Sequence, residues 1–306
     1  MPEFKVPATS ANLGSGYDTV GIALNLFNYF KVEKSEQLKI EVFDLTGKEI
    51  NILQSDNLIL KAYHYYFNYI KEPPVPALII EKMQTPLARG LGSSSAAIIG
   101  GLLAAALMSK HFISESEFIK LAVALEKHPD NVVPALIGGL IINYKQNNID
   151  KYLKIKLAAE LDFVTVIPDF ELKTIQARSV LPAKLNYQQS VFNLGRISLL
   201  TAAFLTADYQ LLKAGMDDML HQPYRKQLIP GFEQVIANAY NAGAWGAALS
   251  GAGPTFLAIT SSKAAEIAAA MEAVFKRHKI AVNSYILKGY NKNTYQLVQE
   301  EALDSD

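Results

Sequence analysis

The sequence predicts an α+β fold with two domains, and three observations support this prediction. The chain has 306 residues, which is long enough for two ordinary domains. Half of the residues are hydrophobic, so each domain can bury a core. Strand-like and helix-like patterns are mixed along the whole chain, and a polar run at 146–151 divides it. We therefore expect one domain at 1–150 and a second at 151–306.

The composition excludes several classes of protein. The chain carries 29 basic and 29 acidic residues, so charge does not favour binding to nucleic acid or to a membrane surface. It has no cysteine, hence neither disulfides nor a thiolate metal site. The first residues lack the apolar segment of a signal peptide, and no apolar run reaches the roughly 20 residues that span a bilayer. We expect a cytoplasmic protein.

The first element is a polar loop between strands. Residues 9–19, TSANLGSGYDT, are rich in glycine, serine and threonine, which is typical of a loop. This loop is either a plain hairpin connection or a substrate loop in which Asn12 and Asp18 are the polar contacts. Alternation and β-branched residues predict strands around it, at 4–8, 20–25, 29–35 and 38–45.

A helix from Asn57 to 70, with Ser55 and Asp56 as its caps, and a strand at 77–82 come next. The segment 86–97, PLARGLGSSSAA, then leads directly into a helix. The first N–H groups of a helix have no intrahelical partner and carry partial positive charge, so they can bind phosphate.

Within this loop, Gly90 and Gly92 allow a ligand to approach the backbone. The serines at 93–95 can cap the helix or offer hydroxyls to an anion or metal. The loop lacks the lysine of a Walker motif and the third glycine of a Rossmann motif. By itself it is equally compatible with a helix cap that binds no ligand. The adjacent Gly100 and Gly101 predict close packing of the helix against a neighbour.

A second polar cluster follows the helix predicted at 115–126. Pro129 prevents that helix from continuing, and Asp130 or Asn131 is expected to cap a short helix that runs to Ala135. Glu126 and His128 lie on the same turn. The cluster is either a solvated turn or part of a functional site.

The second half predicts a strand at 161–169, a short helix at 173–182 and longer helices at 188–206 and 208–220. A glycine turn at 249–255 joins two strands, and a helix at 262–277 and a strand at 282–288 follow. This order is typical of a ferredoxin-like domain. Thr174 and Arg178 share one helical face, and Arg178 and Arg225 are either carboxylate ligands or members of surface salt bridges. We expect the acidic residues at 300–306 to be a frayed tail.

Three separated motifs now stand in a fixed order along the chain. They are VPATSANLGSGYDTVG at 6–21, PLARGLGSSSAA at 86–97 and LSGAGPT at 249–255. Together they resemble the GHMP kinase superfamily. EKHPDNVVPA at 126–135 and QPYRKQLIP at 222–230 make the chain most similar to its homoserine-phosphorylating branch.

The resemblance implies a fold, a reaction and a location for the site. It implies an N-terminal ribosomal-protein-like α+β domain with a left-handed crossover, which binds ATP, and a ferredoxin-like C-terminal domain. It also implies transfer of phosphate from ATP to the side-chain hydroxyl of L-homoserine with Mg²⁺, a step of threonine biosynthesis. The active site would lie between the domains, and a homodimer is expected.

The resemblance also implies which residues bind ATP and metal. Asn57 and Lys82 would lie near the adenine. Mg²⁺ would be held by Glu126 and by either Ser93 or Ser94, since this ion prefers oxygen ligands and keeps phosphate oxygens among them. The phosphates would be wrapped by the loop residues Arg89, Gly90, Leu91, Gly92, Ser93, Ser94 and Ser95.

For the amino acid, the resemblance implies contacts to Asn12, Asp18, His128, Asn131, Thr174, Arg178, Arg225 and Gly251. Asp18 would hold the ammonium group, and the two arginines would hold the carboxylate. Asn131, His128 and Glu126 would surround the reacting groups. Because Asn131 cannot accept a proton, our hypothesis is catalysis by positioning and charge neutralisation, with Asp130 only as a cap.

Two alternatives remain at this point. One is another small-alcohol kinase of the superfamily, such as a mevalonate-type enzyme, although its substrate has no ammonium group for Asp18. The other is a non-catalytic metabolite-binding protein on the same scaffold, against which the complete serine loop and Glu126 argue.

Overall fold

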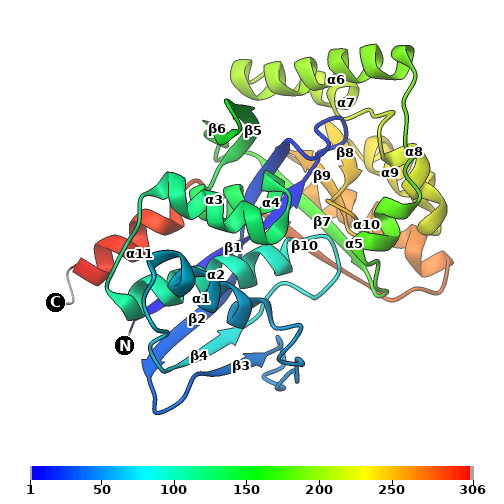
Figure 1. Ribbon diagram of the computed structural model, residues 1–306. Coiled ribbons are helices and arrows are strands. Elements are labelled where there is room, and N and C mark those ends of the chain that lie inside the picture. Colours follow the sequence, from blue (N-terminus) through cyan, green and yellow to red (C-terminus); the bar gives the residue numbers. More distant parts are fainter. Residues whose placement is uncertain (1, 304–306) are drawn as a thin grey trace.

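The computed structural model describes residues 2–303 and contains two β-sheets with helices packed on them (Figure 1). The first sheet has six strands: β1 (Glu3–Ala11), β2 (Val20–Lys34), β3 (Lys39–Phe43), β4 (Ala77–Lys82), β5 (Leu140–Gln146) and β6 (Ile149–Ile155). The second sheet has four: β7 (Asp162–Pro168), β8 (Gly246–Leu249), β9 (Phe256–Thr260) and β10 (Val282–Leu287). The mixed α+β prediction is therefore confirmed.

Strand β2 is the centre of the first sheet. The two strands predicted at 20–25 and 29–35 are one strand of 15 residues. Its first residues pair with β5, its last residues pair with β4, and β1 pairs along its length. The ladder with β1 runs on both sides of the gap between the two predicted strands, with a β-bulge where the partners change from Pro7–Phe27 to Ala8–Leu24.

The polar run at 146–151 does not lie between the sheets. It forms the turn of the β5–β6 hairpin, in which Gln146 pairs with Ile149. Asn147 and Asn148 both have positive φ, a conformation that asparagine adopts more readily than most residues. The first sheet therefore extends to Ile155, beyond the boundary expected at 150.

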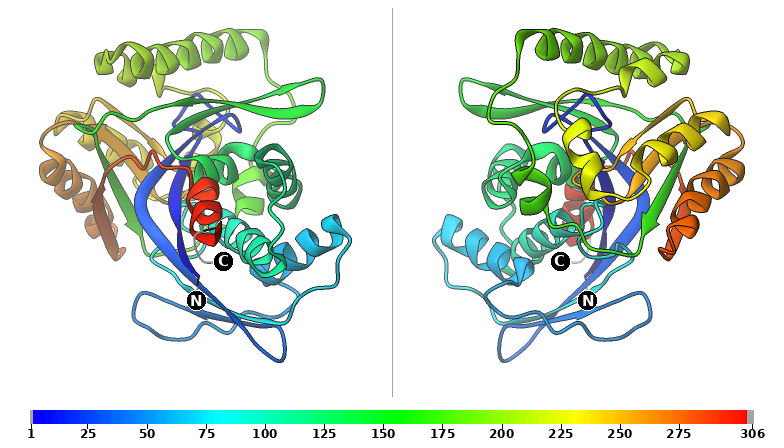
Figure 2. Two further views of the ribbon diagram at one scale, coloured as in Figure 1. Left: turned by 90° about the vertical axis from the view of Figure 1, so that its left-hand side faces the viewer. Right: turned by 90° about the vertical axis from the view of Figure 1, so that its right-hand side faces the viewer.

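Helices cover one face of the first sheet (Figure 2). They are α1 (Leu58–Ile70), α2 (Ser93–Ser109), α3 (Glu115–Glu126) and α4 (Pro129–Ile137), and α11 (Thr294–Leu303) packs against α2, α4 and β1. A Cβ on Gly100 would lie 2.2 Å from the Phe30 ring of the sheet. One on Gly101 would lie 2.4 Å from the backbone oxygen of Ile59 in α1. The close packing predicted from these glycines is confirmed.

The second sheet has the order β10-β7-β9-β8 with all neighbours antiparallel, as predicted for a ferredoxin-like domain. Its helical elements are α5 (Thr174–Ser179), α6 (Tyr187–Thr206), α7 (Leu212–Gly215), α8 (Gln222–Arg225), α9 (Phe232–Asn241) and α10 (Ala264–Arg277). The single helix predicted at 208–220 is wrong. A short 3₁₀ turn precedes α7, which ends at Gly215. A Cβ on Gly215 would lie 2.7 Å from the backbone nitrogen of Leu200 in α6.

The end of the chain returns to the first sheet. Tyr290 donates its N–H to the carbonyl of Ala23, and Gly139 donates to the carbonyl of Tyr290. Helix α11 follows, so 300–303 are helical rather than frayed, and 304–306 lie outside the described residues. Within 2–303, no helix has the length and hydropathy to cross a membrane.

Candidate active site

A cavity of about 430 Å³ lies where the two halves of the chain meet. Loops of the first sheet, the starts of α2 and α4, and the glycine turn of the second sheet all contribute to its wall. The predicted site residues in this wall are Asn12, Asp18, Asn57, Arg89, Gly90, Gly92, Ser93, Ser94, Glu126, His128, Asn131, Thr174, Arg178, Arg225 and Gly251.

Three predicted residues lie outside the wall. Lys82 is exposed on the other face of β4, because side chains alternate along a strand. Its neighbour Glu81 is 2% exposed and lines the cavity instead, where burial raises its pKa to about 7. Leu91 and Ser95 are buried behind the loop, and the carbonyl of Leu91 accepts from the N–H of Thr9.

Helix α1 starts as the sequence indicates, but with a different cap. Asn57 itself is the N-cap, and its Oδ1 accepts from the N–H of Leu60 at 3.0 Å. Ser55 and Asp56, the predicted caps, lie before it. Because its amide oxygen is used by the helix, Asn57 offers its remaining polar atoms to the cavity.

The loop before α2 leaves the helix start open. Gly92 is the N-cap with φ of +69° and makes no side-chain cap hydrogen bond within the described chain. The serines at 93–95 are therefore the first helical residues rather than caps, which corrects the prediction. Their N–H groups precede the first intrahelical bond, in which Ala96 donates to Gly92. This is the geometry that binds phosphate.

Glu126 ends α3 opposite this helix start. Ser94 donates its hydroxyl to the Glu126 carboxylate at 2.9 Å. Burial raises the pKa of Glu126, while the hydroxyls of Ser94 and Ser95 oppose that shift. Within 2–303 no cluster of three acidic or imidazole ligands exists. The donor set fits Mg²⁺ nevertheless, because this ion takes one or two carboxylates and completes its shell with phosphate oxygens and water.

Helix α4 begins two residues earlier than a cap at Asp130 predicts, and three earlier than a cap at Asn131 predicts. His128 is the N-cap and Pro129 the first helical residue, so Asp130 is not the cap. Asp130 is 4% exposed and lines the cavity. Burial, Asp18 and Glu126 raise the pKa of Asp130 to about 7.

Asn131 has its amide fixed by a residue that the sequence did not single out. Thr9 donates its hydroxyl to Asn131 Oδ1 at 2.7 Å. A Cβ on Gly92 would lie 2.0 Å from the same hydroxyl, so the three residues are packed together. This arrangement leaves the Nδ2 of Asn131 as a donor for the cavity.

The side of the cavity that contains Asp18 and Arg178 holds a bidentate ion pair. Arg178 donates from Nη2 to Asp18 Oδ1 at 2.8 Å and from Nη1 to Oδ2 at 3.2 Å. Its Nη1 also donates to the Tyr17 hydroxyl at 2.7 Å. His128 Nδ1 lies 3.5 Å from Asp18 Oδ2, and burial lowers the pKa of this histidine. Asp18 and Arg178 were expected to bind opposite ends of one ligand, and here they bind each other.

Asn12 connects the two halves of the chain beneath this pair. Its Nδ2 donates to the carbonyl of Gly251 at 3.0 Å, and its Oδ1 accepts from the N–H of Asp18 at 3.0 Å. Asn12 and Asp18 both have positive φ. Asn12 thus holds the loop in a conformation that few side chains adopt.

Arg225 is buried, with 2% of its surface exposed. Its Nε donates to the carbonyl of Ala177 at 3.1 Å, and its Nη1 donates to the carbonyl of Gly251 at 2.9 Å. His221 lies 3.1 Å from the same Nη1. The sequence offered one signal for His221, since it precedes Arg225 by four residues, about one helical turn.

Comparison with known proteins shows which family this chain resembles. Models of the GHMP kinase N-terminal domain and of the GHMP kinase C-terminal region match residues 57–139 and 200–277. A homoserine kinase of Halothermothrix orenii is 43% identical over 283 residues, 92% of this chain and 91% of that protein. One of Carboxydothermus hydrogenoformans is 46% identical over 83% of both chains.

The fold is shared with a solved structure. The crystal structure of homoserine kinase from Cytophaga hutchinsonii superposes with a TM-score of 0.86 at 27% identity, and the match covers 95% of each chain. The glycine–serine loop before α2, the acidic residue opposite it and the two-sheet scaffold therefore occur in a chain with extended sequence similarity to these proteins. The chain belongs to the homoserine kinase family of the GHMP kinases.

Proposed function

We propose that the chain transfers the terminal phosphoryl group of ATP to the side-chain hydroxyl of L-homoserine, which gives O-phospho-L-homoserine for threonine biosynthesis. One observation carries this proposal. The open start of α2 and the Asp18–Arg178 pair line the same cavity. The free N–H groups at a helix start are suited to phosphate, and a paired carboxylate and guanidinium are suited to the ammonium and carboxylate groups of an amino acid.

An amino-acid substrate has an ammonium and a carboxylate group on one carbon. The Asp18–Arg178 pair offers a carboxylate and a guanidinium side by side, so such a ligand can exchange the internal ion pair for two new ones. Arg225, also in the wall, adds a second guanidinium for the carboxylate. A substrate without an ammonium group would leave Asp18 partly unpaired, which costs affinity.

For the nucleotide, we propose that the phosphates bind the N–H groups at the start of α2, with Arg89 beside them. Ser94 and Glu126 would hold Mg²⁺, and Ser93 is the neighbouring hydroxyl in the wall. When bound, this ion neutralises charge on the phosphates and orients them. The apolar wall around Ile59 and Met83, with Asn57, is suited to the adenine.

For the reacting hydroxyl, we propose that Asn131 supplies a hydrogen bond rather than a base. Thr9 occupies its carbonyl oxygen, so its Nδ2 donor is turned to the cavity. A loose phosphoryl-transfer transition state needs little assistance from a strong base. Positioning by Asn131 and His128, together with charge neutralisation near Glu126, would then supply most of the acceleration.

The test is the release of ADP with Mg-ATP and a panel of alcohols. The panel contains L-homoserine, L-serine, L-threonine, mevalonate and galactose. Selective turnover of L-homoserine is the expected result. Turnover of another alcohol alone would keep the kinase activity but overturn the roles of Asp18, Arg178 and Arg225. If no alcohol is phosphorylated while ATP still raises the melting temperature, the chain is a binding protein instead.

We also propose that the enzyme works in the cytoplasm, because the reaction consumes ATP, and that it forms a homodimer. The outer side of α6 supports association, since Tyr187, Val191 and Leu194 are 84%, 50% and 64% exposed. Figure 2 shows this helix at one edge of the molecule. Sedimentation of the chain and of a Val191→Glu/Leu194→Glu variant would test this, and a monomeric wild type would refute it.

A further inference from the structure

We propose that His221 is a positioning residue, which in its neutral Nε2–H form holds Arg225 in the orientation that receives the substrate carboxylate. This inference rests on the proposed function, because it concerns how the amino acid is recognised. His221 itself does not line the cavity, so it would act only through Arg225.

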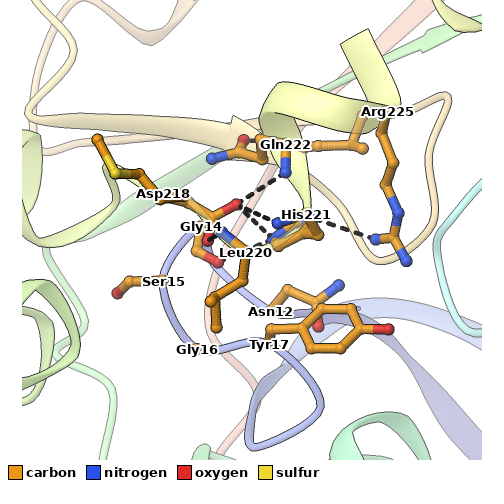
Figure 3. Close-up of polar contacts among 12 residues, drawn as sticks. Asn12, Gly14, Ser15, Gly16, Tyr17, Asp218, Leu220, His221, Gln222 and Arg225 are labelled. Atoms are coloured by element: carbon orange, nitrogen blue, oxygen red, sulfur yellow. Dashed lines mark hydrogen bonds and ion pairs between the residues drawn. The ribbon is translucent and has the colours of Figure 1, made fainter. Parts of the chain in front are cut away.

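His221 is fully buried and lies in a hydrogen-bond network between the two halves of the chain (Figure 3). Its Nε2 is 2.9 Å from the carbonyl oxygen of Gly14 and 3.4 Å from Asp218 Oδ2. The carbonyl oxygen of Gly14 can only accept a hydrogen bond, and so can the carboxylate of Asp218. The hydrogen of the imidazole therefore sits on Nε2.

The other ring nitrogen faces a group that can only donate. Arg225 Nη1 lies 3.1 Å from His221 Nδ1, and a guanidinium has no acceptor. His221 Nδ1 must therefore offer a lone pair to Arg225. The partners on the two sides of the ring thus require the same tautomer, which is neutral.

The surroundings keep this tautomer. Asp218 is fixed by the N–H groups of Leu220, His221 and Gln222, at 2.8, 2.9 and 2.7 Å. Burial lowers the pKa of His221 to about 4, with Asp218 opposing that shift and Arg225 adding to it. At neutral pH the ring is consequently an acceptor for the arginine.

The consequence for Arg225 is a fixed guanidinium plane. Its Nε donates to the carbonyl of Ala177, and its Nη1 donates one hydrogen to the carbonyl of Gly251 and the other to Nδ1 of His221. The Tyr17 ring lies 5.4 Å from the guanidinium carbon. These contacts leave Nη2 for a carboxylate in the cavity, as a bidentate or stacked arginine site requires.

Two substitutions separate the functions of the two ring nitrogens. In His221→Gln, the amide nitrogen can replace Nε2 as the donor to Gly14, but no acceptor remains for Arg225. In His221→Asn, the amide oxygen can replace Nδ1 as that acceptor, but the donor to Gly14 is lost. Both variants remove the ring, so a purely structural role would affect them alike.

The experiment measures kcat and the KM values of L-homoserine and ATP for the wild type and both variants. We expect His221→Gln to raise the KM of L-homoserine about tenfold to a hundredfold, because a hydrogen bond to a charged group is lost. The KM of ATP should stay within about threefold in both variants, and His221→Asn should recover most of the affinity for L-homoserine.

A double-mutant cycle provides a second measurement. Arg225→Gln removes the residue through which His221 is proposed to act, so adding His221→Gln to it should reduce kcat/KM by less than about threefold further. Val235→Ala, at a buried position of α9 outside the network, is the control for lost stability. It should lower the melting temperature without changing the KM of L-homoserine.

The outcomes distinguish the two proposals. If the wild type does not phosphorylate L-homoserine, the proposed function fails and this inference fails with it. If the wild type does so, but His221→Gln and His221→Asn raise the KM values of L-homoserine and ATP to the same extent, only the inference is overturned. The inference would also be overturned if the losses of kcat/KM caused by His221→Gln and Arg225→Gln multiply in the double variant, as they do for independent sites.

Discussion

Asn131 and Asp130 are neighbours in α4, yet their surroundings differ. The amide oxygen of Asn131 accepts from Thr9, whereas the carboxyl of Asp130 is buried near Asp18 and Glu126. Asp130 is a carboxylate with a raised pKa in the cavity wall, so the structure makes it the rival of Asn131 for the catalytic role.

The first prediction concerns this pair. Asn131→Ala should lower kcat by about a hundredfold, as expected when a donor that stabilises the transition state is lost. Asp130→Asn keeps the shape of the side chain and should lower kcat by less than about tenfold. Steady-state kinetics on folded variants measures both values. A much larger loss in Asp130→Asn than in Asn131→Ala would assign the role of base to Asp130.

The second prediction concerns Glu81, which accepts from Asn28 Nδ2 at 2.8 Å and has a pKa raised to about 7 by burial. Between its ordinary carboxyl pKa and this value, the folded state binds more protons than the unfolded state. The contribution of Glu81 to the free energy of unfolding therefore falls as pH rises through this window.

Glu81→Gln keeps the acceptor for Asn28 and removes the titration. Relative to wild type, its free energy of unfolding should improve by roughly 2–3 kcal/mol between about pH 5 and about pH 8. Urea denaturation at both pH values gives the difference, in which other titrating groups cancel. An equal difference at the two pH values would contradict the prediction.

At the scale of elements, helix α2 depends on how closely its neighbours approach. Gly101 faces the backbone of α1, whereas Gly195 in α6 has no atom within 4 Å of the position its Cβ would take. Both lie within helices, so alanine improves the helix propensity at both sites by about 1 kcal/mol. Packing alone distinguishes them.

The third prediction follows from this contrast. Gly101→Ala should lower the free energy of unfolding by about 1–3 kcal/mol, because the methyl group overpacks the α1–α2 contact. Gly195→Ala, the matched control, should raise it by about 0.5–1 kcal/mol. Chemical denaturation measures both. Stabilisation by both substitutions would show that α1 and α2 can separate without cost.

Local signals predicted some elements well and others poorly. Helix α3 spans Glu115–Glu126 as predicted, and a capping box between Ser114 and Glu117 fixes its start. The starts of α2 and α4 were assigned to the wrong caps, because glycine in a left-handed conformation and histidine in an extended one can take that position without a side-chain hydrogen bond. Such caps leave backbone N–H groups free for a ligand.

At the scale of the whole molecule, the last helix completes the first core. Tyr295 is 3% exposed, its hydroxyl donates to the carbonyl of Ile113, and its ring lies 5.0 Å from that of Phe118. These contacts join the last helix of the chain to the core of its first half. Its acidic sequence did not indicate this contact, since the buried face consists of Thr294, Tyr295 and Val298 alone.

The fourth prediction tests this contact. Tyr295→Ala should lower the free energy of unfolding by about 3–5 kcal/mol, the usual cost of removing a buried aromatic ring. Leu303→Ala, in the same helix but 73% exposed, should change it by less than about 0.5 kcal/mol. Denaturation curves for both variants would decide this, and a similar small effect in both would mean that α11 does not support the core.

Patterns along the sequence were enough to predict the class of fold, the ferredoxin-like order of the second half and the open helix start after the glycine–serine loop. Each of these depends on neighbours along the chain, through periodicity, turn chemistry and the geometry of a helix start. Once the ordered motifs were compared with a family, the sequence also predicted 15 of the 29 residues of the cavity wall.

Which polar groups meet depends on contacts between distant parts of the chain, so it could be read only from the folded structure. The pairing of Asp18 with Arg178 spans 160 residues, and that of Thr9 with Asn131 spans 122. The register of the sheet decides that Glu81, rather than Lys82, faces the cavity. The buried positions of Asp130 and His221, which shift their pKa values, likewise depend on packing between segments that are distant in the chain.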